Sequence, residues 1–154
     1  MSTTPPLPLP VFVSLSSALT GVAASQLKPQ IDPIGIAEQY LAILTAKMDA
    51  ALLTKLAAAF NNPADPKAAA VAILATPDLG PVARSIIKLW LLGSWYAPAN
   101  PTNAVQVVSA QAYKESLVWR IMQSHPMGYS MFTFGYWAEQ PPSLSQFITP
   151  ASNT

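Results

Sequence analysis

Residues 76–93 read TPDLGPVARSIIKLWLLG and contain the most regular apolar pattern in the chain. The side chains that recur at helical spacing are Leu79, Val82, Ile86 and Trp90, together with Ile87 and Leu91. Thr76-Pro77 is a helix start signal, and Gly93 is a helix stop signal. The stretch therefore predicts a helix that buries one apolar face.

Two aspartate–proline pairs give further helix start signals. Asp32-Pro33 predicts an N-cap followed by proline at the first helical position, at the head of a long helix. Asp49 can cap a second segment of that helix, which places a break near residues 47–49. Asp65-Pro66 predicts a brief alanine-rich helix that ends at about Leu74.

Apolar spacing adds a helix at each end of the chain. Residues 12–19 have helical periodicity, and Thr20-Gly21 supplies their stop. Ser109 can cap a helix over residues 110–123. Val105, Val107 and Val108 resemble a strand, but no neighbouring segment looks able to pair with them. We therefore interpret them as the approach to the last helix.

These signals predict an all-α fold, an irregular bundle of about five short helices. Residues 1–10 contain four prolines and predict an extended N-terminal arm. A single helical domain covers residues 11–142, and residues 143–154 are a C-terminal tail. No internal repeat and no sustained heptad is present.

The end of the helical domain is uncharged and aromatic. No formal charge occurs between Ile121 and Ala138, and residues 129–137 hold five of the fourteen aromatic residues. Glycine and proline interrupt this stretch too often for a regular helix, so it predicts an irregular contact surface. Its candidate partner-interface residues are Met127, Tyr129, Met131, Phe132, Phe134, Tyr136 and Trp137. The alternative, that part of the stretch covers the chain's own core, stays open.

Composition favours a subunit that another chain covers. Hydrophobic residues make up 51% of the chain and charged residues only 10%, against roughly 25% in ordinary soluble proteins. A transmembrane helix is not expected, because the best apolar run, Ile86 to Trp95, is far shorter than about 20 residues. The net charge of +1 is scattered, which argues against nucleic-acid binding. The absence of cysteine excludes thiol catalysis and thiolate metal sites.

No catalytic, cofactor-binding or metal site is predicted. His125 is the only histidine, so a multi-histidine metal site is excluded and an interface or structural role is expected. Asp32, Asp65 and Asp78 are interpreted as helix-terminus residues. Glu38, Glu115 and Glu139 are each expected in solvent or in an ion pair. Trp90 and Trp95, which flank Gly93, are expected in the core.

Four segments, read in order, resemble one known family. Phe12 to Gly21 reads FVSLSSALTG and resembles the opening motif of the small subunits of bacterial FAD-dependent sugar and polyol dehydrogenases. Ala37 to Leu41 resembles the second-helix segment of that family, and Ile86 to Gly93 resembles its Ile-x-x-x-Trp-x-x-Gly helix. Tyr113 to Trp119, followed by Gly135 to Pro141, resembles its closing helix and tail. The resemblance covers roughly residues 12–142.

The resemblance implies a noncatalytic small subunit. Such a subunit binds a large FAD-containing subunit of the glucose-methanol-choline type and supports its folding, flavin loading, stability or export. It implies FAD in the partner, no cofactor on this chain, and a cytochrome c as electron acceptor. The implied location is the periplasm or the periplasmic face of the inner membrane. The first residues contain neither the basic n-region nor the apolar h-region of a signal peptide. No signal peptide is therefore expected, and a cytoplasmic location stays open.

A second hypothesis needs no partner. A free-standing helical carrier would bind an apolar ligand in a closed cavity, which we would expect Tyr40, Leu44, Ile86 and Trp90 to line. An independent enzyme is the least supported reading, because acid–base and covalent chemistry need positioned partners that the sequence does not show.

Overall fold

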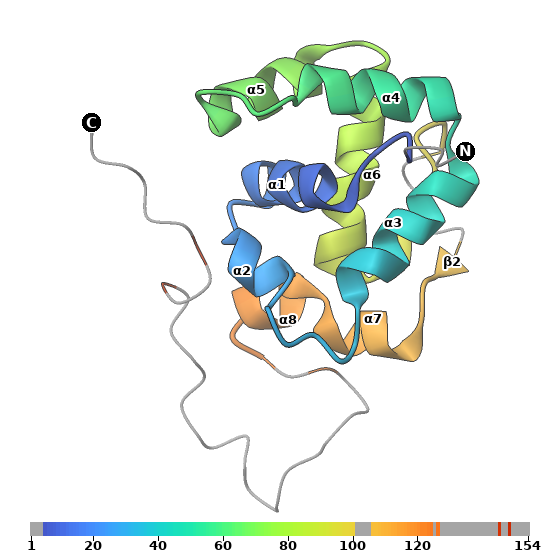
Figure 1. The fold of residues 1–154 in the computed structure, drawn as a ribbon. Helices are drawn as coiled ribbons and strands as arrows, with labels where there is room; N and C mark the ends of the chain where they lie inside the picture. Colours follow the sequence, from blue (N-terminus) through green and yellow to red (C-terminus); the bar gives the residue numbers. More distant parts are fainter. Residues whose placement is uncertain (1–4, 101–105, 125, 127–144, 146–147, 149–154) are drawn as a thin grey trace, which may run out of the picture.

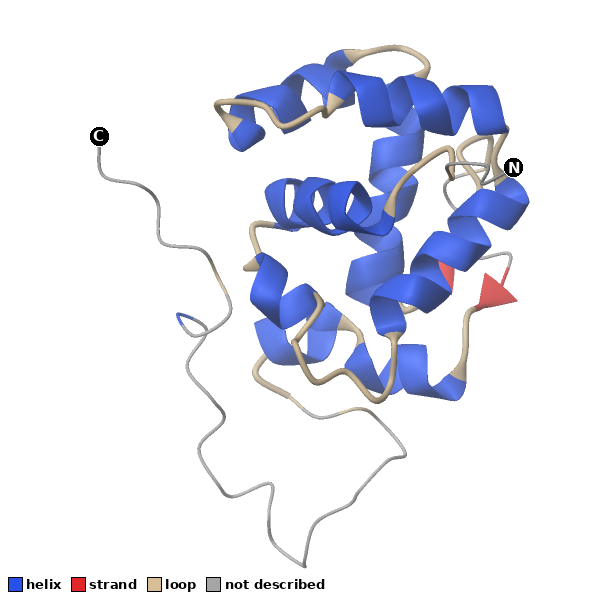
Figure 2. Cartoon of the chain, viewed as in Figure 1, coloured by secondary structure: helices blue, strands red, loops and turns tan. Residues whose placement is uncertain are grey.

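Helices dominate the structure, as the sequence predicts (Figure 2). The computed structural model describes residues 5–100, 106–124, 126, 145 and 148. Their helices are α1 (Leu9–Thr20), α2 (Ala24–Leu27), α3 (Ile36–Lys47), α4 (Ala50–Ala59), α5 (Pro66–Ala75), α6 (Leu79–Leu92), α7 (Ala110–Glu115) and α8 (Leu117–Ile121). Two short strands are β1 (Ser94–Trp95) and β2 (Gln106–Val107). The all-α prediction is confirmed.

Helix α6 connects the two ends of the molecule. It passes behind α1, from the layer formed by α4 and α5 to the layer formed by α7 and α8 (Figure 1). The predicted apolar face is confirmed at Leu79, Val82, Ile86 and Trp90, which are all buried. Leu89 is buried as well, although the predicted face did not include it. The helix begins at Leu79, two residues after the predicted Pro77.

Capping residues set the helix boundaries on the α4–α5 side. The Asp49 side chain accepts a hydrogen bond from the Ala51 amide at 2.8 Å, which confirms the break between α3 and α4. The Asp65 side chain accepts one from the Ala68 amide at 3.0 Å, which confirms the start of α5. Helices α5 and α6 then meet at a bend of 117°.

Helix α1 begins earlier than predicted. It starts at Leu9, inside the stretch assigned to an extended arm, and Pro10 lies in its first turn. Proline is compatible with a first helical turn because the amide it lacks has no intrahelical partner there. Leu7, just before the helix, is only 1% exposed and belongs to the core. The stop at Gly21 is confirmed, with a φ of 74°.

The prediction that Asp32-Pro33 starts a helix is wrong. Helix α3 begins at Ile36, with Gly35 at its N-cap in the left-handed region (φ 65°). The Asp32 carboxylate instead accepts hydrogen bonds from the amides of Ile34 and Gly35, at 3.3 and 2.8 Å. Asp32 therefore closes a turn ahead of the helix, a bonding pattern that competes with N-capping for the same residue type.

The interpretation of Val107 and Val108 as an unpaired approach to the last helix is also wrong. β2 pairs with β1 in an antiparallel register, Ser94 opposite Val107 and Trp95 opposite Gln106. Gly93 ends α6 at φ 63° and turns the chain into β1, and its carbonyl accepts a hydrogen bond from the Val108 amide at 3.1 Å. The pairing strand was missed because it is two residues long and follows a helix directly.

Residues 110–123 form two helices instead of the predicted one. Ser109 caps α7 as predicted, since its hydroxyl accepts a hydrogen bond from the Ala112 amide at 2.9 Å. Ser116 is extended (φ −60°, ψ 138°) and interrupts the helix. Its hydroxyl donates to the Tyr113 carbonyl at 2.9 Å, which gives that carbonyl a partner at the end of α7.

The core is centred on aromatic residues. The Trp90 ring meets the Tyr40 ring edge-on, with centroids 4.9 Å apart, and stacks against Phe12 at 6.2 Å. Trp95 is 2% exposed, so the core role predicted for both tryptophans is confirmed. In the described part of the chain no individual helix is both long and apolar enough to cross a membrane; α5 and α6 meet the length and composition test only as a bent pair.

Candidate partner-binding site

The seven interface residues predicted from the sequence lie outside the described residues, as do His125 and Glu139. These residues are Met127, Tyr129, Met131, Phe132, Phe134, Tyr136 and Trp137. Their assignment stays a prediction. The described part of the chain offers a different surface feature, a hollow at the α7–α8 end of the molecule.

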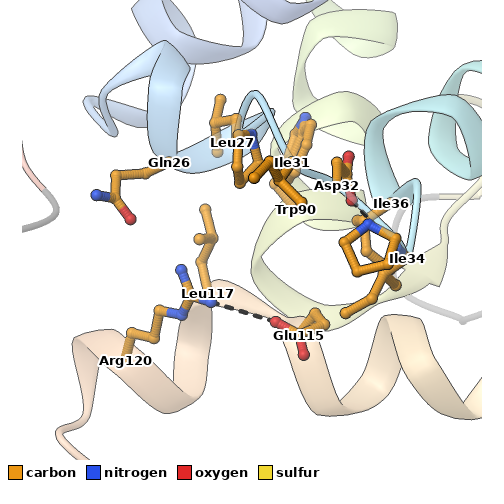
Figure 3. A pocket seen from close by; sticks show the side chains of 12 residues that line it. Gln26, Leu27, Ile31, Asp32, Ile34, Ile36, Trp90, Glu115, Leu117 and Arg120 are labelled. Carbon is orange, nitrogen blue, oxygen red and sulfur yellow. Dashed lines mark hydrogen bonds and ion pairs between the residues drawn. The ribbon is translucent and has the colours of Figure 1, made fainter.

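The hollow lies between the segment 26–36 and helices α6, α7 and α8 (Figure 3). Its volume is about 140 Å³. The apolar side chains that line it are Leu27, Pro29, Ile31, Pro33, Ile34, Ile36, Trp90 and Leu117. Polar lining residues are Gln26, Asp32, Glu115 and Arg120. The hollow is thus an apolar depression with charged groups around it.

Ile31 stands at this hollow with its side chain in solvent. It is 88% exposed, the largest exposed fraction among the large hydrophobic residues described. Pro29 and Pro33 flank it at a distance of two residues on each side and restrict the backbone there. The hydrogen bonds that Asp32 accepts from Ile34 and Gly35 fix the turn that follows. Ile31 is therefore held outward by a conformationally restricted loop.

A small ion-pair group holds the same loop to α3. Lys28 Nζ lies 3.4 Å from Asp32 Oδ2 and 2.5 Å from Glu38 Oε1. The hydrogen bonds to Asp32, from the Gly35 amide above all and from Lys28 as well, hold the pKa of its carboxyl below the ordinary value of 3.8. Glu38, followed by Asp32, raises the pKa of Lys28. The sequence-based expectation of an ion pair is confirmed for Glu38.

A second ion pair lies across the hollow, on α7 and α8. Arg120 donates a hydrogen bond to Glu115 at 3.2 Å, drawn as a dashed line in Figure 3. The ion pair expected for Glu115 is therefore confirmed. Burial, and secondarily the Glu115 charge, raises the pKa of Tyr40 well above its ordinary range. Tyr40 stays protonated and donates a hydrogen bond to the Ala112 carbonyl at 3.5 Å.

Close backbone packing positions α7 under α6. A Cβ atom built on Gly93 would lie 2.5 Å from the Ala112 carbonyl oxygen, so only glycine fits at this crossing. The Tyr113 and Trp119 rings then meet edge-on at 5.3 Å, and Trp119 Nε1 donates to the Tyr113 carbonyl at 2.8 Å. These contacts fix α8, whose Leu117 forms one wall of the hollow.

Exposed apolar residues continue beyond the hollow along α8. Ile121 is 45% exposed and Met122 63% exposed, directly after the lining residue Arg120. On a single continuous helix Tyr113, Leu117 and Ile121 would share a face, yet Leu117 is buried and Ile121 is exposed. The break at Ser116 changes the register between α7 and α8, so one helical face does not continue through both.

The sequence did not identify this surface. One available signal was the isoleucine in the proline-bounded segment Pro29-Gln30-Ile31-Asp32-Pro33, where a loop normally has polar residues. The hollow itself was not accessible to sequence reasoning. It depends on how closely α7 approaches α6, which no local pattern encodes.

The hollow offers apolar contact and paired charges. Among the described residues no group of three or more His, Cys, Asp or Glu side chains is placed to hold a metal ion. Both lining carboxylates already have cationic partners, Asp32 with Lys28 and Glu115 with Arg120. The hollow also does not fit FAD, because its 140 Å³ is well below the roughly 300 Å³ at which small-molecule sites begin.

The hollow is lined by only one of the four residues expected around the cavity of an apolar carrier. Tyr40, Leu44 and Ile86 are fully buried in the core cluster and do not line the hollow. Trp90 is the only one of the four expected residues that does. The three side chains therefore contribute to a packed core, which gives the carrier hypothesis no support.

The described residues form a helical fold with an apolar hollow at one end. Comparison with known proteins identifies the family. The model of the family described as membrane-bound FAD-containing D-sorbitol dehydrogenase matches residues 2–141, most of the 154-residue chain. The chain belongs to this family, and the resemblance to subunits of FAD-containing sugar and polyol dehydrogenases is confirmed. No curated protein and no solved structure matches the chain.

Proposed function

We propose that this chain is the noncatalytic small subunit of a heteromeric FAD-dependent sugar or polyol dehydrogenase. Its role is to bind the large flavoprotein subunit of the glucose-methanol-choline type. The family match over residues 2–141 carries the proposal. The exposed apolar surface around the hollow supports it, because a chain with 10% charged residues needs a partner to cover such surface.

The chemistry of the described residues is consistent with the noncatalytic part of the proposal. Hydride transfer from a hydroxyl needs a flavin and a base within hydrogen-bond reach of that hydroxyl. The hollow is too small for FAD, and its carboxylates are occupied in ion pairs. In this proposal substrate oxidation belongs to the large subunit, and electrons pass from its flavin to a cytochrome c.

Binding by this subunit supports the folding, flavin loading or export of its partner, and the complex works at the periplasmic face of the membrane. Physically, a bound small subunit stabilises only the folded partner and so shifts the folding equilibrium toward it. This part of the proposal predicts that the large subunit, made alone, is recovered with less flavin and at lower yield.

Co-expression with a large FAD-containing dehydrogenase subunit tests the proposal. The tagged chain is purified with and without that subunit, and the flavin absorption spectrum of the eluate is recorded. We expect a stoichiometric complex with bound flavin that oxidises a sugar or polyol. A well-behaved monomer with no affinity for the flavoprotein would contradict the proposal, and so would substrate oxidation by this chain alone.

A further inference from the structure

We propose that the hollow beside Ile31 receives one aromatic side chain of the flavoprotein subunit, with a lysine or arginine of that subunit next to it. Ile31 in turn packs against the surface that carries this ring. The inference rests on the proposed function and names the part of the described surface through which it acts.

The volume of the hollow limits its occupant to about one aromatic ring. Its 140 Å³ is close to the roughly 150 Å³ of an engineered apolar protein cavity that binds benzene. Leu27, Trp90 and Leu117 offer apolar contact to such a ring. A single aromatic ring fits this space, whereas a helix laid into a groove would need apolar anchor sites on successive turns.

The loop that carries Ile31 is prepared for binding. Pro29, Pro33 and the turn closed by Asp32 restrict it before any partner arrives. A restricted side chain loses little conformational entropy on association, so its buried area contributes more fully to affinity. Burial of an isoleucine that is 88% exposed in the isolated chain would contribute favourable free energy to association.

The charges at the hollow select the residue beside the ring. Two carboxylates, Asp32 and Glu115, and one guanidinium, Arg120, line it, which leaves a net charge of −1. Adding the remaining members of the ion-pair group, Lys28 and Glu38, does not change this balance. A cationic side chain on the partner complements it, while a carboxylate there would be repelled.

Other exposed apolar residues do not combine these features. Val71 on α5 is 59% exposed and Val107 on β2 is 57% exposed, and neither lines the hollow. Ile31, by contrast, lines the hollow, and the exposed residues Ile121 and Met122 directly follow its lining residue Arg120 in the sequence. In the sequence this surface leads directly into the stretch from Met127 that we predict to contact the same partner.

Site-specific photo-crosslinking within the full complex tests the inference. A photoreactive phenylalanine derivative replaces Ile31 in one variant and Val71, on the opposite end of the molecule, in the matched control. Both positions are well exposed, so both variants are expected to fold. After irradiation, mass spectrometry identifies the linked peptides.

We expect the Ile31 variant to link to a peptide of the flavoprotein subunit that contains an aromatic residue next to a lysine or arginine. We expect no such link from the Val71 variant. Links from position 31 only to this chain's own residues 127–137 would overturn the inference, as would a complex that forms without any link at that position. If the complex forms without a link at position 31, only this inference fails. If the flavoprotein does not bind at all, the proposed function fails too.

Discussion

The two ends of α6 are built from different residues. At its beginning, α4 and α5 expose mainly small side chains, namely Ala50, Ala51, Ala58, Ala59, Ala68, Ala72 and Ala75. At its end, the segment 26–36 and helices α7 and α8 combine a hollow, an exposed isoleucine and two ion-pair groups. In Figure 1 these ends lie at the top and the bottom of the molecule.

We interpret this difference as a structural end and, under the proposed function, a partner-binding end. Alanine exposes little apolar area, so the α4–α5 layer tolerates water without a partner. Its ion pair between Lys55 and Asp78 is about half exposed on both sides and adds little stability. The other end keeps five charged residues around an apolar hollow, in a chain where charged residues are scarce. Changes at the two ends should therefore affect different properties.

The largest effect is expected at the crossing that creates the hollow. Gly93→Ala introduces a side chain at φ 63° and places its Cβ against the Ala112 carbonyl. The left-handed backbone costs about 1–2 kcal/mol, and the backbone clash adds roughly 1–3 kcal/mol. Unfolding by urea should show the summed loss in free energy.

Gly21→Ala is the matched control for this prediction. Gly21 also ends a helix in the left-handed region (φ 74°), but no atom lies within 4 Å of its added Cβ. Only the backbone cost of about 1–2 kcal/mol should remain. Equal losses for the two variants would show that the close approach of α6 and α7 is not a constraint.

The next prediction is a change that weakens binding and leaves the stability of the isolated chain unchanged. Ile31→Asp places a carboxylate beside an apolar and already negative hollow, so the Kd for the flavoprotein subunit should rise roughly 30-fold, about 2 kcal/mol. The melting temperature of the isolated chain should stay unchanged, because the side chain is 88% exposed. Val71→Asp, at the structural end, should change neither value. Equal weakening by both variants would remove the distinction between the ends.

A comparable loss is predicted in the aromatic stretch of the sequence. Replacing Phe134 or Trp137 by alanine should weaken complex formation by at least ~2 kcal/mol if these residues are interface anchors. Titration calorimetry with the purified flavoprotein measures the change. Unchanged assembly in both variants would refute their assignment and leave the hollow as the main contact.

A smaller effect is expected from Asp32 in acid. Its folded-state pKa lies below 3.8, so its contribution to stability is complete above that pH and is lost as pH falls through the folded value. Asp32→Asn keeps an oxygen acceptor for the Ile34 and Gly35 amides but loses the charge. The variant should be less stable by about 1 kcal/mol at neutral pH and should lose less stability in acid. Identical acid titrations of stability would contradict the account of this loop.

Local signals predicted the helices well and the hollow not at all. Asp49, Asp65 and Ser109 cap helices as their sequence neighbours indicate, because capping depends on bonds across two or three residues. The capping prediction was wrong for Asp32 because the same carboxylate can close a turn instead. The hollow depends on the contact between Gly93 and Ala112, two residues that are distant in sequence. Local sequence patterns do not reveal such contacts.

Sedimentation velocity, followed through flavin absorption, tests the central claim most directly. The flavoprotein subunit is run alone and then with an excess of this chain, each previously purified. We expect the flavin boundary to move to a larger sedimentation coefficient, consistent with one added small subunit, and we expect Ile31→Asp to reduce this shift. A flavin boundary that stays unchanged when the chain is added, while the chain sediments separately, would contradict the account.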